Sequence, residues 1–143
     1  MCSLNMRKRT RAREFALQVL YQVDITRDNY AACLDNFWQA HGQEHIEEGL
    51  KNFTVDLVKG VAENLPQIDT KISQHATNWQ LQRMAVVDRN ILRMGCFELL
   101  FRDDIPPKVS INEAVELAKK YSGLEAGKFV NAILDKIKLE KNK

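Results

Sequence analysis

The sequence predicts an all-α protein, because apolar residues recur at helical spacing along most of its 143 residues and no alternating strand pattern of useful length interrupts them. We expect about seven helices in two small helical subdomains that share a buried central helix. Hydrophobic residues make up 45% of the chain, which is enough to form a core, and charged residues make up 28%. No apolar run approaches the roughly 18 residues that a membrane-spanning helix needs.

Four amphipathic helices are expected in the first half of the chain. Their apolar stripes lie within residues 12–23, 30–38, 46–61 and 68–76. Asp28-Asn29 breaks the chain after the first stripe and His41-Gly42 after the second. Pro66 opens the fourth helix, because a proline is tolerated in a first turn, where no intrahelical N–H bond is lost.

Residues 86–101 are apolar around most of the helix circumference, which is typical of a helix buried on nearly all sides. We expect this segment to be the central helix, with Cys96 as a small buried hydrophobe. Pro106-Pro107 then forces a loop.

The sixth helix is expected to begin at a capping box formed by Ser110 and Glu113. In such a box the serine hydroxyl accepts a hydrogen bond from the backbone N–H of the glutamate, and the glutamate carboxylate accepts one from the backbone N–H of the serine. Ser122-Gly123 should end this helix, and a seventh should begin near Ala126. We therefore expect one domain over residues 1–143, with a flexible basic arm at 1–9 and subdomains at about 10–65 and 66–139.

Positive charge is concentrated at the start of the chain. Five cations occur there with no acid among them: Arg7, Lys8, Arg9, Arg11 and Arg13. The whole chain has 21 Lys and Arg against 19 Asp and Glu, a net +2; without these five, 16 bases stand against 19 acids, so residues 14–143 sum to −3. A local basic cluster on a nearly neutral protein is the footprint expected for polyanion binding.

Thr10 is a plausible N-cap, which would leave Arg7–Arg9 in the arm and put Arg11 and Arg13 on the helix. In one continuous helix, Arg9 and Arg13 would instead lie on one side, with Arg7 and Arg11 on another. The alternative is a solubilising tail. Cations at a helix N-terminus are unfavourable by about 0.3–1 kcal/mol each, which favours the binding interpretation.

Two weaker signals lie elsewhere. Leu17 and Tyr21 form a second apolar ridge on the first helix, either packed between helices or available to a protein partner. Lys128 and Phe129 lie near the turn between the last two helices, where a ring can stack on a base and a cation can hold a phosphate, although a phenylalanine in such a position is more often a core residue.

Signs of catalysis or of a cofactor are not found. The sequence has no glycine-rich phosphate loop, nucleophile elbow or paired carboxylates, and His41 and His45 lack further ligands at suitable spacing for a metal. Three widely spaced cysteines indicate a reducing compartment rather than a disulfide framework. We expect a non-enzymatic, cytoplasmic protein without a membrane segment.

The chain resembles the NusB family of bacterial transcription antitermination factors over nearly its whole length. The resemblance is carried by the start at residues 7–22, by Asn78-Trp79, by residues 87–93 and 97–100, and most strongly by residues 105–121 and 128–135.

The resemblance implies an all-α fold and binding to the single-stranded boxA element of ribosomal RNA leader transcripts. It also implies that the ribosomal protein NusE and an RNA polymerase antitermination complex are partners, and that a homodimer is possible. The implied RNA side comprises Arg7, Lys8, Arg9, Arg11, Arg13, Glu125, Lys128 and Phe129. The implied NusE contacts are Asp88 and, less directly, Tyr21.

Two other functions stay open at this point. The first is a protein-interaction scaffold that does not itself bind RNA. The second is the targeting domain of a ribosomal RNA cytosine methyltransferase, to which the family's fold is also related. We expect the second to fail on length, because a cofactor-binding α/β domain does not fit within this chain.

Overall fold

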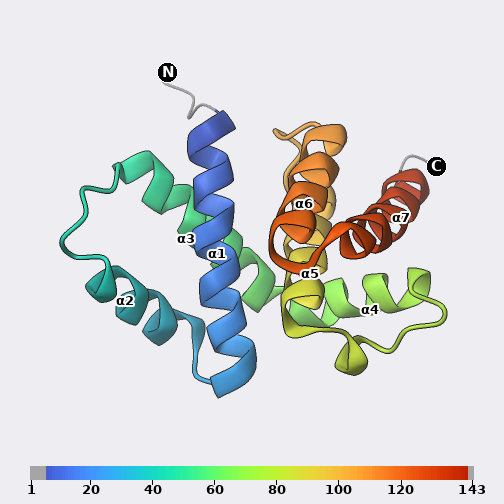
Figure 1. Ribbon diagram of the computed structural model, residues 1–143, viewed down its shortest axis with the longest axis horizontal. Coiled ribbons are helices and arrows are strands. Elements are labelled where there is room, and N and C mark those ends of the chain that lie inside the picture. The colour runs from blue at the N-terminus through green and yellow to red at the C-terminus, as the bar shows by residue number, and fades with distance from the viewer. Residues whose placement is uncertain (1–5, 142–143) are drawn as a thin grey trace. The chain divides into compact units, whose positions relative to one another are not determined.

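The computed structural model describes residues 6–141, and in that range it contains seven α-helices, one short 3-10 helix and no strand (Figure 1). The all-α prediction is confirmed. The helices are α1 (Met6–Thr26), α2 (Tyr30–Ala40), α3 (Glu48–Glu63), α4 (Leu65–His75), η1 (Leu81–Arg83), α5 (Val86–Phe101), α6 (Pro107–Ser122) and α7 (Leu124–Lys141). The chain divides into two compact units, Met1–Ala62 and Glu63–Lys143. None of the described helices is long and apolar enough to cross a membrane.

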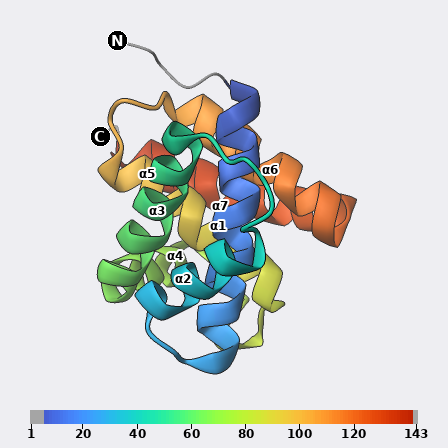
Figure 2. The same ribbon diagram turned by 90° about the vertical axis from the view of Figure 1, so that its left-hand side faces the viewer.

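The first unit contains α1, α2 and α3, and Figures 1 and 2 show α2 and α3 alongside α1. Asn29 caps α2, because its side chain accepts a hydrogen bond from the Ala32 N–H at 2.8 Å. Phe15 of α1 meets Phe37 of α2 edge to face, with ring centroids 5.1 Å apart. On α3, the buried Thr54 hydroxyl bonds the Leu50 carbonyl at 2.9 Å, which satisfies a polar group inside the core.

Helix α1 begins earlier than the sequence predicted. It starts at Met6, and the Thr10 hydroxyl donates to the Met6 carbonyl at 2.9 Å instead of capping the helix. The expectation of a flexible arm is therefore wrong for residues 7–9, which are helical, while residues 1–5 lie outside the described part. The ion pair of Lys8 with Glu47 and the contact of Arg9 with the Phe53 ring offset the unfavourable position of these two cations at the N-terminus of the helix.

The second unit is built around α5, which packs against α4, α6 and α7. Gly95 allows the closest approach: a Cβ at this position would lie 2.7 Å from Leu134 Cδ1 on α7. Cys96 is fully buried beside it, and burial raises the pKa of its thiol to about 12. The predicted central helix is thus confirmed as a buried helix with Cys96 as an apolar core residue.

The predicted capping box at Ser110 is wrong. Helix α6 begins at Pro107, whose fixed φ suits a first helical position, so Ser110 lies inside the helix. Ser110 is buried, and its hydroxyl donates to Glu98 Oε1 on α5 at 2.7 Å. The local spacing suggested a cap, but the hydroxyl instead stabilises a buried carboxylate from the neighbouring helix.

Gly123 separates α6 from α7 with a φ of 109°, a backbone conformation that disfavours any residue with a side chain. The turn is so short that α7 begins at Leu124, two residues before the predicted start near Ala126. This turn places Glu125, Lys128 and Phe129 in the first turns of α7.

Candidate nucleic-acid interface

The five cations of α1 occupy two faces of one continuous helix, as the helical phase requires. Arg9 and Arg13 lie over the Phe53 ring of α3, with guanidinium carbons 4.6 and 5.3 Å from its centroid. Cation–π contacts of this kind stabilise a partly desolvated guanidinium. Arg13 is only 2% exposed, whereas Arg9 is half-buried. Arg13 therefore contributes to packing and is not part of the exposed cationic surface.

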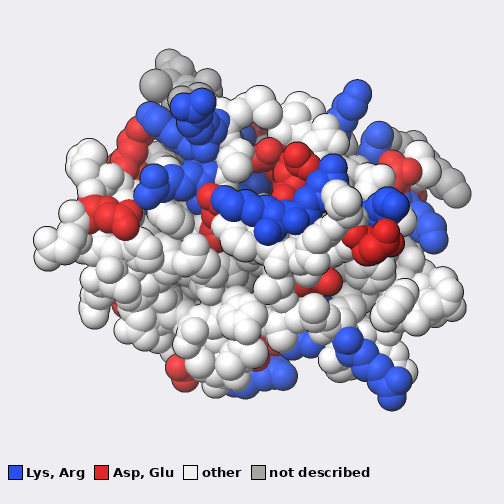
Figure 3. All heavy atoms as spheres, in the orientation of Figure 1, with Lys and Arg blue, Asp and Glu red and all other residues white. Residues whose placement is uncertain are grey.

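Arg7, Lys8 and Arg11 lie on the other face of α1, around a surface hollow of about 370 Å³. The loop between α2 and α3 (residues 41–47) supplies the opposite wall. Two acids of that loop meet the cations: Glu47 pairs with Lys8, and Glu44 Oε2 lies 3.1 Å from Arg11 Nη2. Figure 3 shows Lys and Arg atoms gathered over the N-terminal end of α1 with Asp and Glu atoms beside them.

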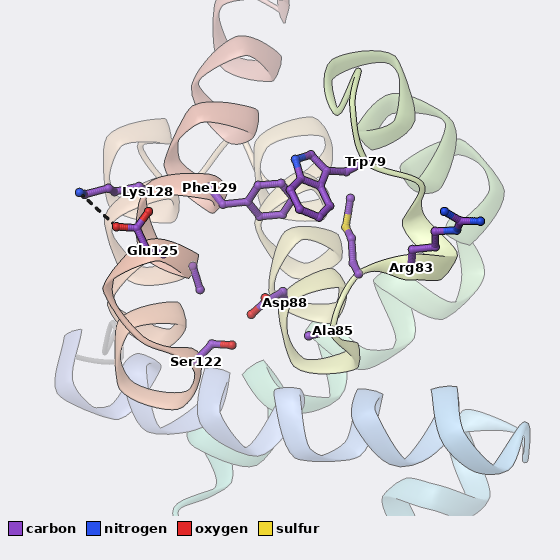
Figure 4. A pocket seen from close by; sticks show the side chains of 10 residues that line it. Trp79, Arg83, Ala85, Asp88, Ser122, Glu125, Lys128 and Phe129 are labelled. Carbon is purple, nitrogen blue, oxygen red and sulfur yellow. Dashed lines mark hydrogen bonds and ion pairs between the residues drawn. The ribbon is translucent and has the colours of Figure 1, made fainter.

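A second concave surface lies within the second unit and has a volume of about 630 Å³. Its wall combines apolar, aromatic and charged side chains from the α4–α5 connection, α5, the end of α6 and the start of α7 (Figure 4). The residues that line it are Trp79, Arg83, Met84, Ala85, Asp88, Ser122, Glu125, Ala126, Lys128 and Phe129. We call this the α5–α7 pocket.

Trp79 and Phe129 form an aromatic pair on the wall of the α5–α7 pocket. Their rings meet edge to face with centroids 5.6 Å apart, and Figure 4 shows them side by side. Trp79 is 57% exposed and Phe129 is half-buried, so the pair presents apolar ring surface to solvent. Sequence reasoning identified Phe129 but assigned no role to Trp79, although an indole in a segment without an apolar stripe was an available signal.

Lys128 and Glu125 lie at the rim of the α5–α7 pocket and face each other across 3.4 Å. Their side chains are 77% and 90% exposed, so this i,i+3 pair is weak and its lysine is available to an anionic ligand. The predicted RNA-side residues of α7 are thus brought together with Trp79 in one place.

Asp88, predicted as a NusE contact, also lines the α5–α7 pocket rather than standing apart from the predicted RNA residues. Its Oδ1 atom is buried and has no hydrogen-bond partner among residues 6–141. A buried carboxylate oxygen without a donor is costly, which makes Asp88 a natural acceptor for a donor supplied by a ligand or partner.

The second apolar ridge of α1 divides into a buried and an exposed residue. Leu17 is 5% exposed and belongs to the core, which matches the packed alternative, while Tyr21 is 41% exposed. The cations of α1 belong to the first unit and the α5–α7 pocket to the second. Among residues 6–141, no group of three or more His, Cys, Asp or Glu side chains is arranged to hold a metal ion.

Comparison with known proteins places this architecture in a family. The model of the NusB family matches residues 10–138. The transcription antitermination protein NusB of Anaeromyxobacter dehalogenans is 48% identical over 130 residues, which cover 91% of this chain and 89% of that protein. The protein of the same name from Myxococcus xanthus is 43% identical over 139 residues, covering 96% and 99%.

Solved structures give the same result for the fold. The structure of T. maritima NusB matches with a TM-score of 0.84 and 37% identity, covering 98% of this chain and 94% of that one. A chain from the crystal structure of antitermination factors NusB and NusE in complex with dsRNA matches with a TM-score of 0.84 and 30% identity, covering 95% and 99%. The sequence match, the helical architecture and the coverage of both chains agree, and the chain belongs to the NusB family.

Proposed function

We propose that this protein is a non-enzymatic transcription antitermination factor that binds the boxA element of ribosomal RNA leader transcripts together with NusE. In this proposal the pair then joins an RNA polymerase antitermination complex. The observation that carries the proposal is the exposed cationic face of α1, in a chain whose relatives are named transcription antitermination proteins. In this proposal the protein acts by binding and not by catalysis, so its function depends on the residues of its binding surface.

The α1 face supplies the electrostatic part of RNA binding. Arg7, Lys8 and Arg11 lie around one hollow, so that one strand could contact all three cations. Arginine and lysine contacts to phosphate dominate the affinity of nucleic-acid complexes and make it depend on salt. Arg13 acts indirectly, because its buried guanidinium positions α1 against α3.

The α5–α7 pocket supplies the base-stacking part of RNA binding, which favours an unpaired strand. Base stacking on an aromatic ring requires an unstacked base, which a single strand offers and a duplex withholds. Trp79 and Phe129 present such ring surface, and Lys128 stands beside them for a phosphate. The aromatic pair therefore supports a single-stranded target, although a related structure is described with dsRNA.

A titration of boxA RNA tests the proposal, with the single strand, its duplex and a scrambled strand as ligands, each with and without NusE. Arg11→Gln should weaken single-strand binding and reduce the slope of log affinity against log salt by up to about 0.7, the full value of one phosphate contact. Lys59→Gln is the matched control, since Lys59 is exposed on α3 and does not line the hollow. Equal effects of both variants would remove the α1 face from the mechanism.

A second candidate is a protein-interaction scaffold that does not itself bind RNA. The exposed Tyr21 ring and the unpartnered Asp88 oxygen favour it, because both are groups that a protein partner commonly covers or satisfies. Failure of RNA binding with and without NusE, combined with retained NusE binding, would select this candidate. Sedimentation of the isolated chain in the same series reports whether it forms a homodimer.

A further inference from the structure

The cationic hollow of α1 is closed on one side by acids of its own unit. Lys8 pairs with Glu47 and Arg11 pairs with Glu44, so two of the three cations at the hollow already hold carboxylates. Both acids belong to the α2–α3 loop, and Glu47 directly precedes the first residue of α3, Glu48. A strand that binds these cations must first displace the carboxylates.

The two ion pairs are suited to exchange. The side chains of Lys8 and Glu47 are 42% and 47% exposed, and those of Arg11 and Glu44 are 55% and 47% exposed. Exposed ion pairs of this kind contribute little to stability and are easily broken. An isolated anion competes poorly, because the loop keeps its carboxylates at a high effective concentration, whereas a strand that engages several cations at once competes well.

We infer that Glu44 and Glu47 are affinity-setting residues of this surface: their carboxylates occupy Arg11 and Lys8 in the free protein and give way only to a dense polyanion. The inference rests on the proposed function, since RNA is the polyanion in question. The loop acids lower the affinity for every anion but lower it most for sparse ones. They thereby raise the selectivity for a continuous phosphate backbone.

The exchange also predicts a distinctive salt dependence. A cation that moves from a carboxylate to a phosphate leaves that carboxylate unpaired beside the strand, which cancels part of the counterion release. Removing both carboxylates should therefore steepen the slope of log affinity against log salt by up to about 1.4, from about 0.7 for each contact on a single strand. A general change in the electrostatic potential of the protein would alter the affinity but would not steepen the slope in this way.

The test measures RNA binding by Glu44→Gln/Glu47→Gln in the full chain, over a series of salt concentrations. We expect single-stranded RNA affinity to rise roughly tenfold at low salt, from two exposed pairs of ordinary strength, together with the steeper slope. Glu48→Gln is the control, because Glu48 is exposed, adjoins Glu47 in sequence and belongs to neither pair. It removes one negative charge, as each of the two changes in the double variant does, and should change affinity less than twofold.

A double-mutant cycle separates the pair from its surroundings. Glu47→Gln should raise the affinity for RNA in the wild-type background but not in a Lys8→Gln background, because that background has no cation at position 8 for Glu47 to mask. A heparin fragment serves as a second polyanion probe in every titration. Heparin binding that tightens in the double variant without any RNA binding would support the masking and overturn the proposed function.

Two results would overturn the inference itself. One is wild-type affinity and slope in the double variant for both RNA and heparin, which would leave the proposed function intact if the wild type binds RNA. The other is a gain from Glu48→Gln equal to the gain from Glu47→Gln alone, which would assign the effect to net charge. Loss of all polyanion binding in every variant overturns both the inference and the proposed function.

Discussion

The hydroxyl of Ser110 on α6 donates a hydrogen bond to Glu98 Oε1 on α5 across 2.7 Å, and both residues are at most 2% exposed. This bond joins α5, the central helix of the second unit, to α6, and it satisfies a carboxylate oxygen in the core of that unit. Ser110→Ala removes a donor from a buried acceptor, so we expect the free energy of unfolding to fall by about 1–3 kcal/mol. Urea denaturation of the variant and the wild type measures this change in the free energy of unfolding.

Ser122→Ala is the control for that experiment, because Ser122 lies on the same helix with an exposed side chain. It should change stability by no more than about 0.5 kcal/mol. A Ser110→Ala variant as stable as Ser122→Ala would show that the bond between α6 and α5 does not stabilise the fold.

Gly95 and Gly127 provide a matched pair for testing helix packing. A Cβ at Gly95 would lie 2.7 Å from Leu134 Cδ1 in the core, while one at Gly127 would lie 2.8 Å from Cγ of the flexible Lys119 side chain. Gly95→Ala should destabilise by about 1–3 kcal/mol through overpacking. Gly127→Ala should destabilise less than Gly95→Ala, since the helix preference of alanine offsets part of the clash and the Lys119 side chain is partly exposed to solvent. Thermal unfolding of both variants checks the contrast, which equal effects would contradict.

The pH dependence of stability should report the contacts of Glu140 on α7 with α4. Hydrogen bonds from Lys71, with Nζ 2.5 Å from Oε1, and then from His75 lower the pKa of the Glu140 carboxyl below its ordinary value. Because the pKa of Glu140 is lower in the folded state than in the unfolded state, its contacts stabilise the fold at pH values above the ordinary carboxyl pKa of about 4.3. This stabilisation is lost as the pH falls through the pKa of the folded state.

We therefore expect Glu140→Gln to lower the urea midpoint at pH 7 and to have a diminishing effect as the solution is acidified below about pH 4. Glu116→Gln serves as the comparison, since Glu116 is an exposed acid of α6 paired only at 3.4 Å with Lys119. A difference between Glu140→Gln and wild type that is the same at pH 7 and at pH 3 would contradict the assignment.

Trp79 should report RNA binding directly. The chain has two tryptophans, so a Trp38→Phe background leaves Trp79 as the only indole. We expect single-stranded boxA RNA to quench its fluorescence as a base stacks on the ring. Trp79→Ala should weaken binding by about 5- to 150-fold, from the 1–3 kcal/mol of a stacked base, and Trp79→Phe should restore most of it. RNA binding without quenching, or at full strength in Trp79→Ala, would exclude the indole from the interface.

The sequence determined the helices themselves and the division of the α1 cations into two faces. An apolar stripe is a local pattern, and the position of a side chain around a helix follows from 3.6 residues per turn. Arg9 and Arg13 therefore share the Phe53 face, and Arg7 and Arg11 the other, once the helix is continuous. The sequence also identified α5 as a buried helix, because its apolar residues surround it.

The sequence was least reliable where a polar side chain had a choice of partners. Ser110 fits the local spacing of a cap and Thr10 fits an N-cap, yet one bonds a carboxylate of another helix and the other bonds a carbonyl one turn back. Local rules rank these alternatives only weakly, because each partner is worth a similar free energy.

Only the tertiary structure decided which distant groups meet. Glu47 lies 39 positions from Lys8, and Glu44 lies 33 positions from Arg11, so no local pattern indicates that loop acids cover the basic face. The same holds for the Trp79–Phe129 pair and for Asp88 beside it, which come from different elements of the second unit. These contacts depend on how helices pack, and packing is set by the summed fit of many side chains rather than by any one segment.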